Sequence, residues 1–373
     1  MSEPQAEAVV DLDAYRANLG ELARLAPGAA QMAVVKADGY GHGMVPIARA
    51  AREAGVAWLG VATLEEALAL RAGGDTGPVL CWLAAPGAPF AAAIEAGVEV
   101  TASSAEQLEE ILRSAPAGTT RPRVQLKVDT GLSRNGARGP HWDLLVAAAA
   151  RAQRDGRLEV TGVWSHFACA DEPEHPANAA AERVFADAVD LARSAGLDPR
   201  WRHLANSAAL LTRPSAHLDL VRPGIATYGI APDPGLAGHA ALRPVMTLRG
   251  RLASVKRVPA GTAVSYGHTW VAPRETTLGL VPLGYGDGVL RTASGRAECG
   301  FAGQRVAVAG RVCMDQLVVD LGDLPARRGD VVTLFGDEPG APTAEDWGAA
   351  AGTIGYEVVT RLGGRIVRRY RGT

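Results

Sequence analysis

The fold of this chain is decided by the stretch Ala33-Val34-Val35-Lys36-Ala37-Asp38-Gly39-Tyr40-Gly41-His42-Gly43. The apolar run 32–35 predicts a buried strand that ends at a lysine and breaks into a glycine-rich turn, with a helix expected over 44–54. Burial disfavours the charged form of an amine and lowers its pKa. A neutral amine attacks carbonyl groups and forms Schiff bases. Taken alone, the stretch is better explained by a lysine that ends a strand and points to water, so the remaining pattern decides.

Short apolar runs alternate with helical patterns over the first two thirds of the chain. The runs predict eight strands at 32–36, 57–62, 79–83, 98–102, 123–129, 159–166, 202–206 and 219–222. Their apolar character is nearly continuous, which is typical of strands buried on both faces. Eight such strands separated by helices predict parallel pairing and a (β/α)8 barrel of the TIM type.

A barrel of this kind carries its reactive residues at the carboxyl ends of its strands. Polar side chains stand there in five of the predicted units, namely Lys36, Lys127 with Asp129 and Arg134, Ser165 with His166, Asn206 with Ser207, and Arg222 with Gly224. Their common position indicates one site built from several strands.

The alternation of strand and helix patterns ends near residue 240, after a linker rich in proline and glycine at 232–238. Beyond it, strand patterns dominate, with one helix expected from a cap at Thr343 to about residue 351. We therefore expect two domains: an α/β barrel over residues 1–240 and a mostly β domain over residues 241–373. The first ten residues predict a strand that can pair with the second domain, and Asp11 or Asp13 is expected to cap the helix that follows.

Composition excludes several classes of function. The net charge of −2 gives no electrostatic basis for binding nucleic acid or an anionic membrane. No apolar run approaches the roughly 18 residues of a membrane span. The sequence opens without the basic and apolar segments of a signal peptide, and its four cysteines lack metal-type or redox spacing. We expect a cytoplasmic protein with reduced thiols and without a metal site.

The loops after the last two barrel strands are a common phosphate site in this fold. Here they hold the Ser207 hydroxyl and the amides at Gly224 and Ile225, although in isolation a helix cap explains Ser207 better and an ordinary turn explains Gly224 better. A phosphate site facing Lys36 suggests pyridoxal phosphate, which needs an imine lysine, a phosphate anchor and a partner for its ring nitrogen. Arg222 is placed to be that partner, and a salt bridge at the strand end is the alternative.

The sequence contains further polar residues that could take part in this site. His166 is interpreted as a residue that polarises its neighbours. Lys127 lies between apolar neighbours and close to Arg134, so one of the two cations has to be modified, neutral or paired with Asp129. In the second domain, three motifs stand out from plain sheet structure: Ser265-Tyr266-Gly267, the segment 310–316, and Ile354-Gly355-Tyr356-Glu357, in which the tyrosine is expected in a short loop after a helix.

Together, the motifs resemble the alanine racemase family, pyridoxal-phosphate enzymes with a barrel and a β domain. The resemblance covers nearly the whole chain, through AVVKADGYGHG, VRPGI, SYGHTW, GYGDG, GRVCMDQ and IGYEV in that order. It implies racemisation of alanine, a supply of D-alanine for peptidoglycan, and a homodimer with shared sites. One departure is the loop Gly131–Gly136, where Ser133 and Asn135 flank the arginine in place of small or apolar neighbours.

The resemblance also implies roles for individual residues. Lys36 would carry the cofactor and act as the base toward D-alanine, and Tyr266 of the partner subunit would be the opposite base. The remaining cofactor contacts would come from Tyr40, His166, Asn206, Ser207, Arg222, Gly224, Ile225 and Tyr356. Substrate would meet Arg134, Met314 and Tyr285, supported by Asp315 and by Lys127, which is carbamylated in some members.

Three other functions fit parts of the sequence. A related pyridoxal-phosphate decarboxylase shares the two-domain plan, but decarboxylation benefits from an acidic partner at the ring nitrogen, and Arg222 is basic. A cofactor-carrying barrel protein without turnover would lack the domain at 241–373. A racemase of broader specificity would be expected to carry an export signal.

Overall fold

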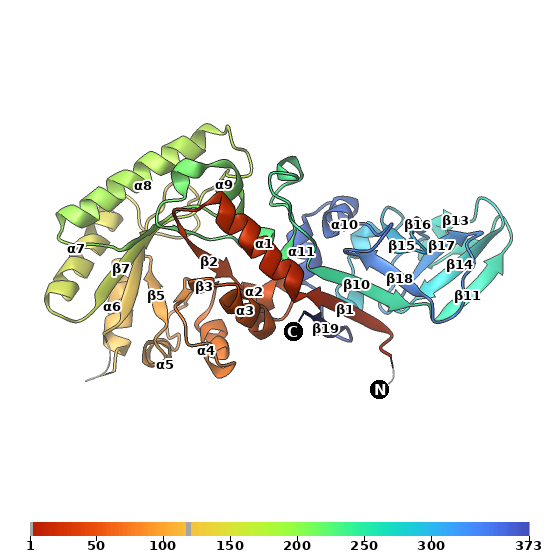
Figure 1. Cartoon of the computed structure of the whole chain (residues 1–373), viewed down its shortest axis with the longest axis horizontal. Coiled ribbons are helices and arrows are strands. Elements are labelled where there is room, and N and C mark those ends of the chain that lie inside the picture. The colour runs from red at the N-terminus through yellow and green to blue at the C-terminus, as the bar shows by residue number, and fades with distance from the viewer. Residues whose placement is uncertain (1–2, 117–120, 373) are drawn as a thin grey trace.

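The computed structural model describes residues 3–116 and 121–372, which form a barrel and a β-sheet domain lying side by side (Figure 1). The barrel holds eight parallel strands in the order β8-β7-β6-β5-β4-β3-β2-β9. Their bounds are β2 (Ala30–Val34), β3 (Trp58–Val61), β4 (Val79–Cys81), β5 (Glu99–Ala102), β6 (Arg123–Lys127), β7 (Glu159–Trp164), β8 (Trp201–His203) and β9 (Leu220–Val221). Each falls within or overlaps one of the eight predicted ranges, so the barrel predicted from the sequence is confirmed.

The ring of strands closes between β8 and β9 through the backbone. The amide of Asp219 donates to the Arg202 carbonyl at 3.2 Å, and the amide of Arg222 donates to the Ala205 carbonyl at 3.0 Å. Strand β9 also pairs parallel with β2, which brings the carboxyl ends of these two strands next to each other. The turn that carries Lys36 and the strand end that carries Arg222 therefore face the same mouth of the barrel.

Helices surround the strands and alternate with them along the chain (Figure 1). They are α1 (Leu12–Leu25), α2 (Lys36–Tyr40), α3 (Met44–Glu53), α4 (Leu64–Ala72), α5 (Phe90–Glu95), α6 (Ala105–Ser114), α7 (Pro140–Arg154), α8 (Pro176–Ser194) and α9 (Ser207–Thr212). The Asp11 carboxylate accepts from the Ala14 amide at 2.9 Å, so the predicted cap of α1 is confirmed. Thr63 and Glu66 form a capping box that begins α4.

The second domain is a nine-stranded sheet in the order β11-β14-β17-β16-β15-β18-β10-β1-β19, with a separate β12–β13 hairpin. Its strands are β1 (Ala6–Asp11), β10 (Met246–Arg251), β11 (Ser254–Val258), β12 (Ala263–Val264), β13 (Trp270–Val271), β14 (Thr276–Val281), β15 (Glu298–Phe301), β16 (Gln304–Val308), β17 (Leu317–Gly322), β18 (Val331–Phe335) and β19 (Val367–Arg371). The N-terminal strand β1 pairs antiparallel with β10 and parallel with β19. The first and last strands of the described chain thus lie in this sheet.

Short helical segments join these elements. They are α10 (Ala344–Ala351), α11 (Gly355–Thr360) and the 3-10 turns η1 (Pro214–Ala216), η2 (Ile225–Tyr228), η3 (Pro234–Leu236), η4 (Tyr266–His268), η5 (Tyr285–Asp287) and η6 (Arg291–Ala293). The cap of α10 is Thr343, as expected from the sequence.

The prediction that Tyr356 lies in a loop was wrong, because the structure places it in helix α11. Helix α10 ends at Gly352 in the left-handed conformation, and the chain turns and begins a second helix three residues later. The segment was missed because it is only six residues long and contains Val358 and Val359, whose branched side chains disfavour helix.

Candidate active site

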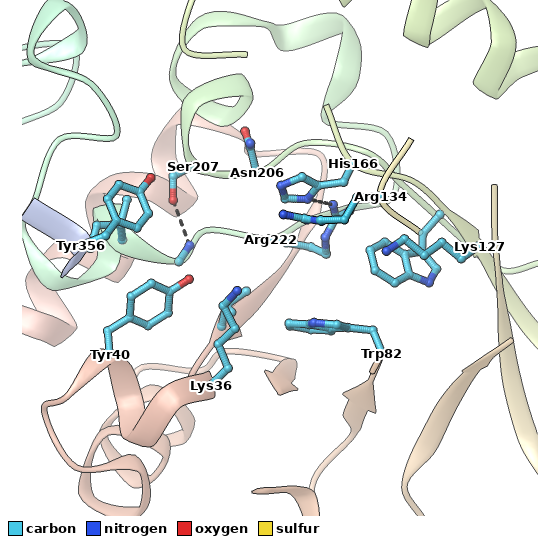
Figure 2. Close-up of a pocket in the computed structure, with 14 residues that line it drawn as sticks. Lys36, Tyr40, Trp82, Lys127, Arg134, His166, Asn206, Ser207, Arg222 and Tyr356 are labelled. Atoms are coloured by element: carbon cyan, nitrogen blue, oxygen red, sulfur yellow. Dashed lines mark hydrogen bonds between the residues drawn. The ribbon is translucent and has the colours of Figure 1, made fainter. Parts of the chain in front are cut away.

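A cavity of about 250 Å³ opens at the carboxyl ends of the barrel strands (Figure 2). It is lined by Val34, Lys36, Tyr40, Trp82, Lys127, Arg134, Trp164, His166, Asn206, Ser207, Arg222, Gly224, Ile225 and Tyr356. Helix α11 of the second domain supplies Tyr356, and the barrel supplies the others. The stretch 33–43 and the predicted strand ends therefore meet in one site.

Lys36 enters this cavity from an unusual turn. Residues 37–40, which we call the left-handed turn, all have positive φ between 50° and 62°. Such a conformation costs roughly 1–2 kcal/mol for each residue other than glycine. It is closed by two backbone bonds, from the Gly41 amide to the Ala37 carbonyl and from the Gly43 amide to the Asp38 carbonyl. The turn reverses the chain at the barrel mouth and aims Lys36 into the cavity (Figure 2).

The surroundings of Lys36 shift its amine toward the neutral form. Burial lowers its pKa, and the Arg134 cation lowers it further, while the Glu66 carboxylate opposes both effects. Glu66 also accepts from the Ala37 amide at 2.6 Å, which ties helix α4 to the left-handed turn. A half-buried neutral amine is the form that attacks a carbonyl group.

Opposite Lys36, small groups and hydroxyls form what we call the anion cradle: Tyr40, Ser207, Gly224, Ile225 and Tyr356. The Ser207 hydroxyl accepts from the Gly224 amide at 2.9 Å. A methyl group added at Gly224 would lie 2.5 Å from the Tyr40 hydroxyl, so only glycine allows this approach. Burial raises the pKa values of Tyr40 and Tyr356, which keeps both phenols protonated as donors. Asn206 caps α9 by accepting from the Ala209 amide at 3.0 Å.

Arg222 is buried at the floor of the cavity. Its guanidinium donates to the carbonyls of Ser165 at 2.7 Å and Leu204 at 3.2 Å, to Nδ1 of His203 at 3.0 Å, and toward Nδ1 of His166 at 3.3 Å. Among the described residues no carboxylate pairs with it, so the salt bridge considered from the sequence is absent there. Burial lowers the pKa of Arg222 to about 9, and the pKa of His166 lies well below its ordinary value through burial and this cation.

On the other side of the cavity lie Lys127, Arg134 and two tryptophans. Lys127 Nζ stands 4.3 Å from the centroid of the Trp164 ring. Arg134 is exposed at the rim, in a loop that Asp129 organises by accepting from the Gly131 and Ser133 amides at 2.9 and 3.0 Å. A cation held at the rim of a pocket is suited to a carboxylate ligand.

Four expected site residues do not line this cavity in the described chain: Tyr266, Tyr285, Met314 and Asp315. All four lie on the second domain and are exposed, Tyr266 at 72% and Met314 at 54%. The Gly286 amide donates to the Met314 carbonyl at 2.8 Å, which holds two of their loops together. Asp315 pairs with Arg365 at 2.8 Å. A single chain therefore leaves these residues apart from Lys36.

Sequence reasoning missed three large side chains of the site. Trp82 follows β4 directly, Trp164 ends β7, and His203 ends β8 beneath Arg222. The same rule that found Lys36, a position at the carboxyl end of a barrel strand, would have found all three.

No group of three or more histidine, cysteine, aspartate or glutamate side chains suited to a metal occurs in residues 3–116 and 121–372. Over those residues there is likewise no helix of the length and apolarity that crossing a bilayer requires.

The fold and the cavity define a class: barrel proteins with a β domain in which a strand-end lysine faces an anion cradle. The profiles of the alanine racemase N-terminal and C-terminal domains match residues 10–232 and 245–370. An alanine racemase of Frankia casuarinae is 56% identical, over 97% of this chain and 95% of its own length. The chain belongs to the alanine racemase family.

Solved structures agree with this assignment. The crystal structure of alanine racemase from the D-cycloserine-producing Streptomyces lavendulae has a TM-score of 0.97 and 53% identity, and the match covers 100% of this chain and 98% of that one. The alanine racemase of Bacillus anthracis with bound L-Ala-P has a TM-score of 0.89 at 33% identity, covering 100% of this chain and 96% of that one.

Proposed function

We propose that this chain interconverts L-alanine and D-alanine, using pyridoxal phosphate bound to Lys36. The observation that carries the proposal is the meeting of Lys36, Arg222 and the anion cradle in one cavity of a chain from this family. The residues fit the cofactor: Lys36 is a lysine with a lowered pKa, and the cradle has space that any side chain at Gly224 would fill. Lys36 would hold the cofactor through an imine and the cradle would hold its phosphate. When bound, pyridoxal phosphate makes the α-hydrogen of an amino acid acidic.

The remaining residues would orient the substrate and handle the proton. Arg134 at the rim would bind the alanine carboxylate, and the Met314 backbone of a second chain would join it. Lys36 Nζ would take or return the α-proton on one face of the substrate, and Tyr266 Oη of the partner chain would serve the other face. Arg222 would donate to the cofactor ring nitrogen while its own proton stays in place, because a guanidinium gives up a proton poorly. We also propose the homodimer on this basis, and the cytoplasmic location stays a prediction.

Two measurements test the proposal. Incubation with L-alanine followed by chiral chromatography should show D-alanine, and absence of D-alanine would refute the activity. Reduction of the purified protein with borohydride, followed by peptide mapping, should place a pyridoxyl group on Lys36. A label on another lysine would refute the assigned anchor while leaving the activity standing.

A further inference from the structure

The interior of the barrel is half polar. In barrels of this type the interior is mostly filled by branched apolar side chains. Here one side is an apolar cluster made of Met32, Trp58, Leu80 and Leu220. The other side holds buried polar groups, each at most 4% exposed, namely Glu99, Gln125, Thr161 and His203. Burying such groups is costly unless they are bonded, so their contacts call for an explanation.

Three hydrogen bonds connect these groups to the cavity. Arg222 Nη1 donates to His203 Nδ1 at 3.0 Å, His203 Nε2 lies 2.6 Å from Gln125 Oε1, and Gln125 Nε2 donates to Glu99 Oε2 at 2.9 Å. A guanidinium only donates, so His203 Nδ1 accepts and its proton sits on Nε2. Burial and the Arg222 cation hold the pKa of His203 well below its ordinary value, in agreement with a neutral ring. The donor and the acceptor of each of these three hydrogen bonds are therefore fixed.

These hydrogen bonds end, at the point farthest from the cavity, in the buried carboxylate of Glu99. Glu99 Oε2 also accepts from the Thr161 hydroxyl at 2.7 Å, and Arg123 Nη2 lies 2.7 Å from Glu99 Oε1 as an ion pair. Burial raises the pKa of Glu99, while the donors from Gln125 and Thr161 and the Arg123 cation lower it. The carboxylate thus faces the Arg222 cation through two neutral side chains rather than through a direct ion pair.

The surrounding backbone is shaped to hold this arrangement. A methyl group at Gly162 on β7 would lie 3.0 Å from Gln125 Oε1, so glycine leaves the room that the amide occupies. The pairing of β6 with β7 shifts register at Gln125, as a bulge does. The ring of Trp164 stacks on His203 with an interplanar angle of 2° and a centroid distance of 5.6 Å. These contacts restrict both the amide and the imidazole to one orientation.

We propose that Glu99, Gln125 and His203 form a hydrogen-bond relay that positions the Arg222 guanidinium from inside the barrel. Gln125 and Glu99 are then positioning residues for the reaction, although neither side chain lines the cavity. The kinetic part of this inference rests on the proposed racemase activity, whereas the geometric part does not. The competing explanation is that these groups only satisfy one another in the barrel core.

The geometric part is tested by NMR of the protein as purified, with ¹⁵N-labelled histidine. We expect the His203 imidazole in the neutral Nε2–H form with a proton protected from solvent exchange, identified as the signal that vanishes in His203→Gln. In Gln125→Met the proton loses its acceptor, so its resonance should move upfield and exchange faster. A His203 signal with its proton on Nδ1, or one unchanged in Gln125→Met, would overturn the relay.

The kinetic part compares Gln125→Met with Thr161→Val, because each removes one donor to the same Glu99 carboxylate. Only Gln125 connects that carboxylate to His203. We expect Gln125→Met to lower kcat by about tenfold or more with KM for alanine changed less than about threefold, since Arg222 does not bind the substrate carboxylate. Thr161→Val should keep both constants close to wild type while lowering the melting temperature.

Equal losses of kcat in the two variants would support the packing explanation and overturn the positioning role. A kcat of Gln125→Met equal to that of the wild-type protein would overturn the positioning role as well. If the wild-type protein forms no D-alanine, the proposed function fails, but the NMR comparison still tests the relay by itself. The two proposals therefore fail in distinguishable ways.

Discussion

Lys127 is a buried cation among other cations. It lies over the Trp164 ring, and burial first, then Arg222 and Arg134, lower its pKa to about 8 while Asp129 opposes them. No ion pair joins Lys127 to Asp129 within the described part of the chain, which removes one of the three resolutions that the sequence left open. An amine with this pKa is partly neutral near pH 7.5, and a neutral amine can add carbon dioxide with loss of one proton. The resulting carbamate anion would turn repulsion from Arg134 into attraction.

The first prediction follows from this environment of Lys127. Lys127→Ala should lower kcat/KM for alanine, and acetate should restore part of the loss by supplying the missing anion beside Arg134. Sodium chloride at the same ionic strength is the control and should restore nothing. The prediction would be contradicted if the native mass of the wild-type protein lacked the mass of one bound carbon dioxide and acetate did not raise the activity of Lys127→Ala.

The second prediction concerns His42, which is buried beneath the left-handed turn. Its Nδ1 lies 2.9 Å from the Tyr40 carbonyl and 3.1 Å from the Gly39 carbonyl, so it donates to the turn, and burial lowers its pKa to about 4. Between pH 6.5 and 4 the unfolded imidazole binds a proton that the folded one does not. The free energy of unfolding should therefore fall as pH drops through this window, by up to about 3 kcal/mol from this residue.

Urea unfolding at several pH values measures this contribution. His42→Gln keeps a donor for the turn but cannot titrate, so its free energy of unfolding should fall less steeply than that of wild type over the same range. His166 and His203 remain in both proteins and contribute equally. Identical slopes would mean that His42 is not held neutral in the folded chain.

At the scale of elements, the barrel strands were predictable because each is a short apolar run buried on both faces. The predicted ranges also located Lys36, His166, Ser207 and Arg222 at one mouth, since parallel strands bring their carboxyl ends together. The left-handed turn at residues 37–40 was not predictable, because three of its four residues are not glycine and adopt positive φ only under contacts from elsewhere. Strand β15 was missed because its four residues, Glu298–Phe301, include a charged residue and a glycine and form no apolar run. Helix α11 was missed because it has only six residues, two of them valines whose branched side chains disfavour helix.

Besides the Glu66 contact, these outside contacts come from strand β19 of the second domain. Arg368 Nε donates to the Gly41 carbonyl at 2.9 Å, and its Nη1 pairs with Asp38 at 2.8 Å. The Tyr370 hydroxyl donates to the His42 carbonyl at 3.0 Å. A methyl at Gly43 would collide with that hydroxyl, at 2.0 Å. The edge of the β domain thus braces the turn that holds Lys36.

The third prediction tests this bracing by hydrogen exchange. Arg368→Met should speed exchange of the Gly41 and Gly43 amides by about threefold to tenfold, as loss of one hydrogen bond implies. Arg369→Met is the matched control, because Arg369 is the next residue on β19 and pairs with Glu7 away from the turn. Equal effects of the two variants would attribute the change to the strand as a whole rather than to the Arg368 contacts.

At the scale of the whole molecule, the chain places its candidate bases on different surfaces. Lys36 lies in the barrel cavity, whereas Tyr266 is 72% exposed in η4, on the second domain beyond the linker. Racemisation requires a proton donor and acceptor on each face of the substrate, because a single base tends to return the proton to the face it left. A second copy of the chain that brings Tyr266 to the cavity would supply the missing face.

The fourth prediction is that two inactive variants restore activity when mixed. In a dimer of Lys36→Ala with Tyr266→Phe, one site combines an intact Lys36 from one chain with an intact Tyr266 from the other, while the second site lacks both. Random exchange of subunits makes about half of the dimers mixed, so activity per chain should reach about one quarter of wild type. Each variant alone, taken through the same exchange conditions, is the control and should stay inactive. If Tyr266 instead served the cavity of its own chain, both sites of every mixed dimer would be broken and no activity would return. The Tyr266→Phe homodimer separates the two bases further: through Lys36 it should still exchange the α-hydrogen of D-alanine with solvent deuterium, while forming almost no L-alanine.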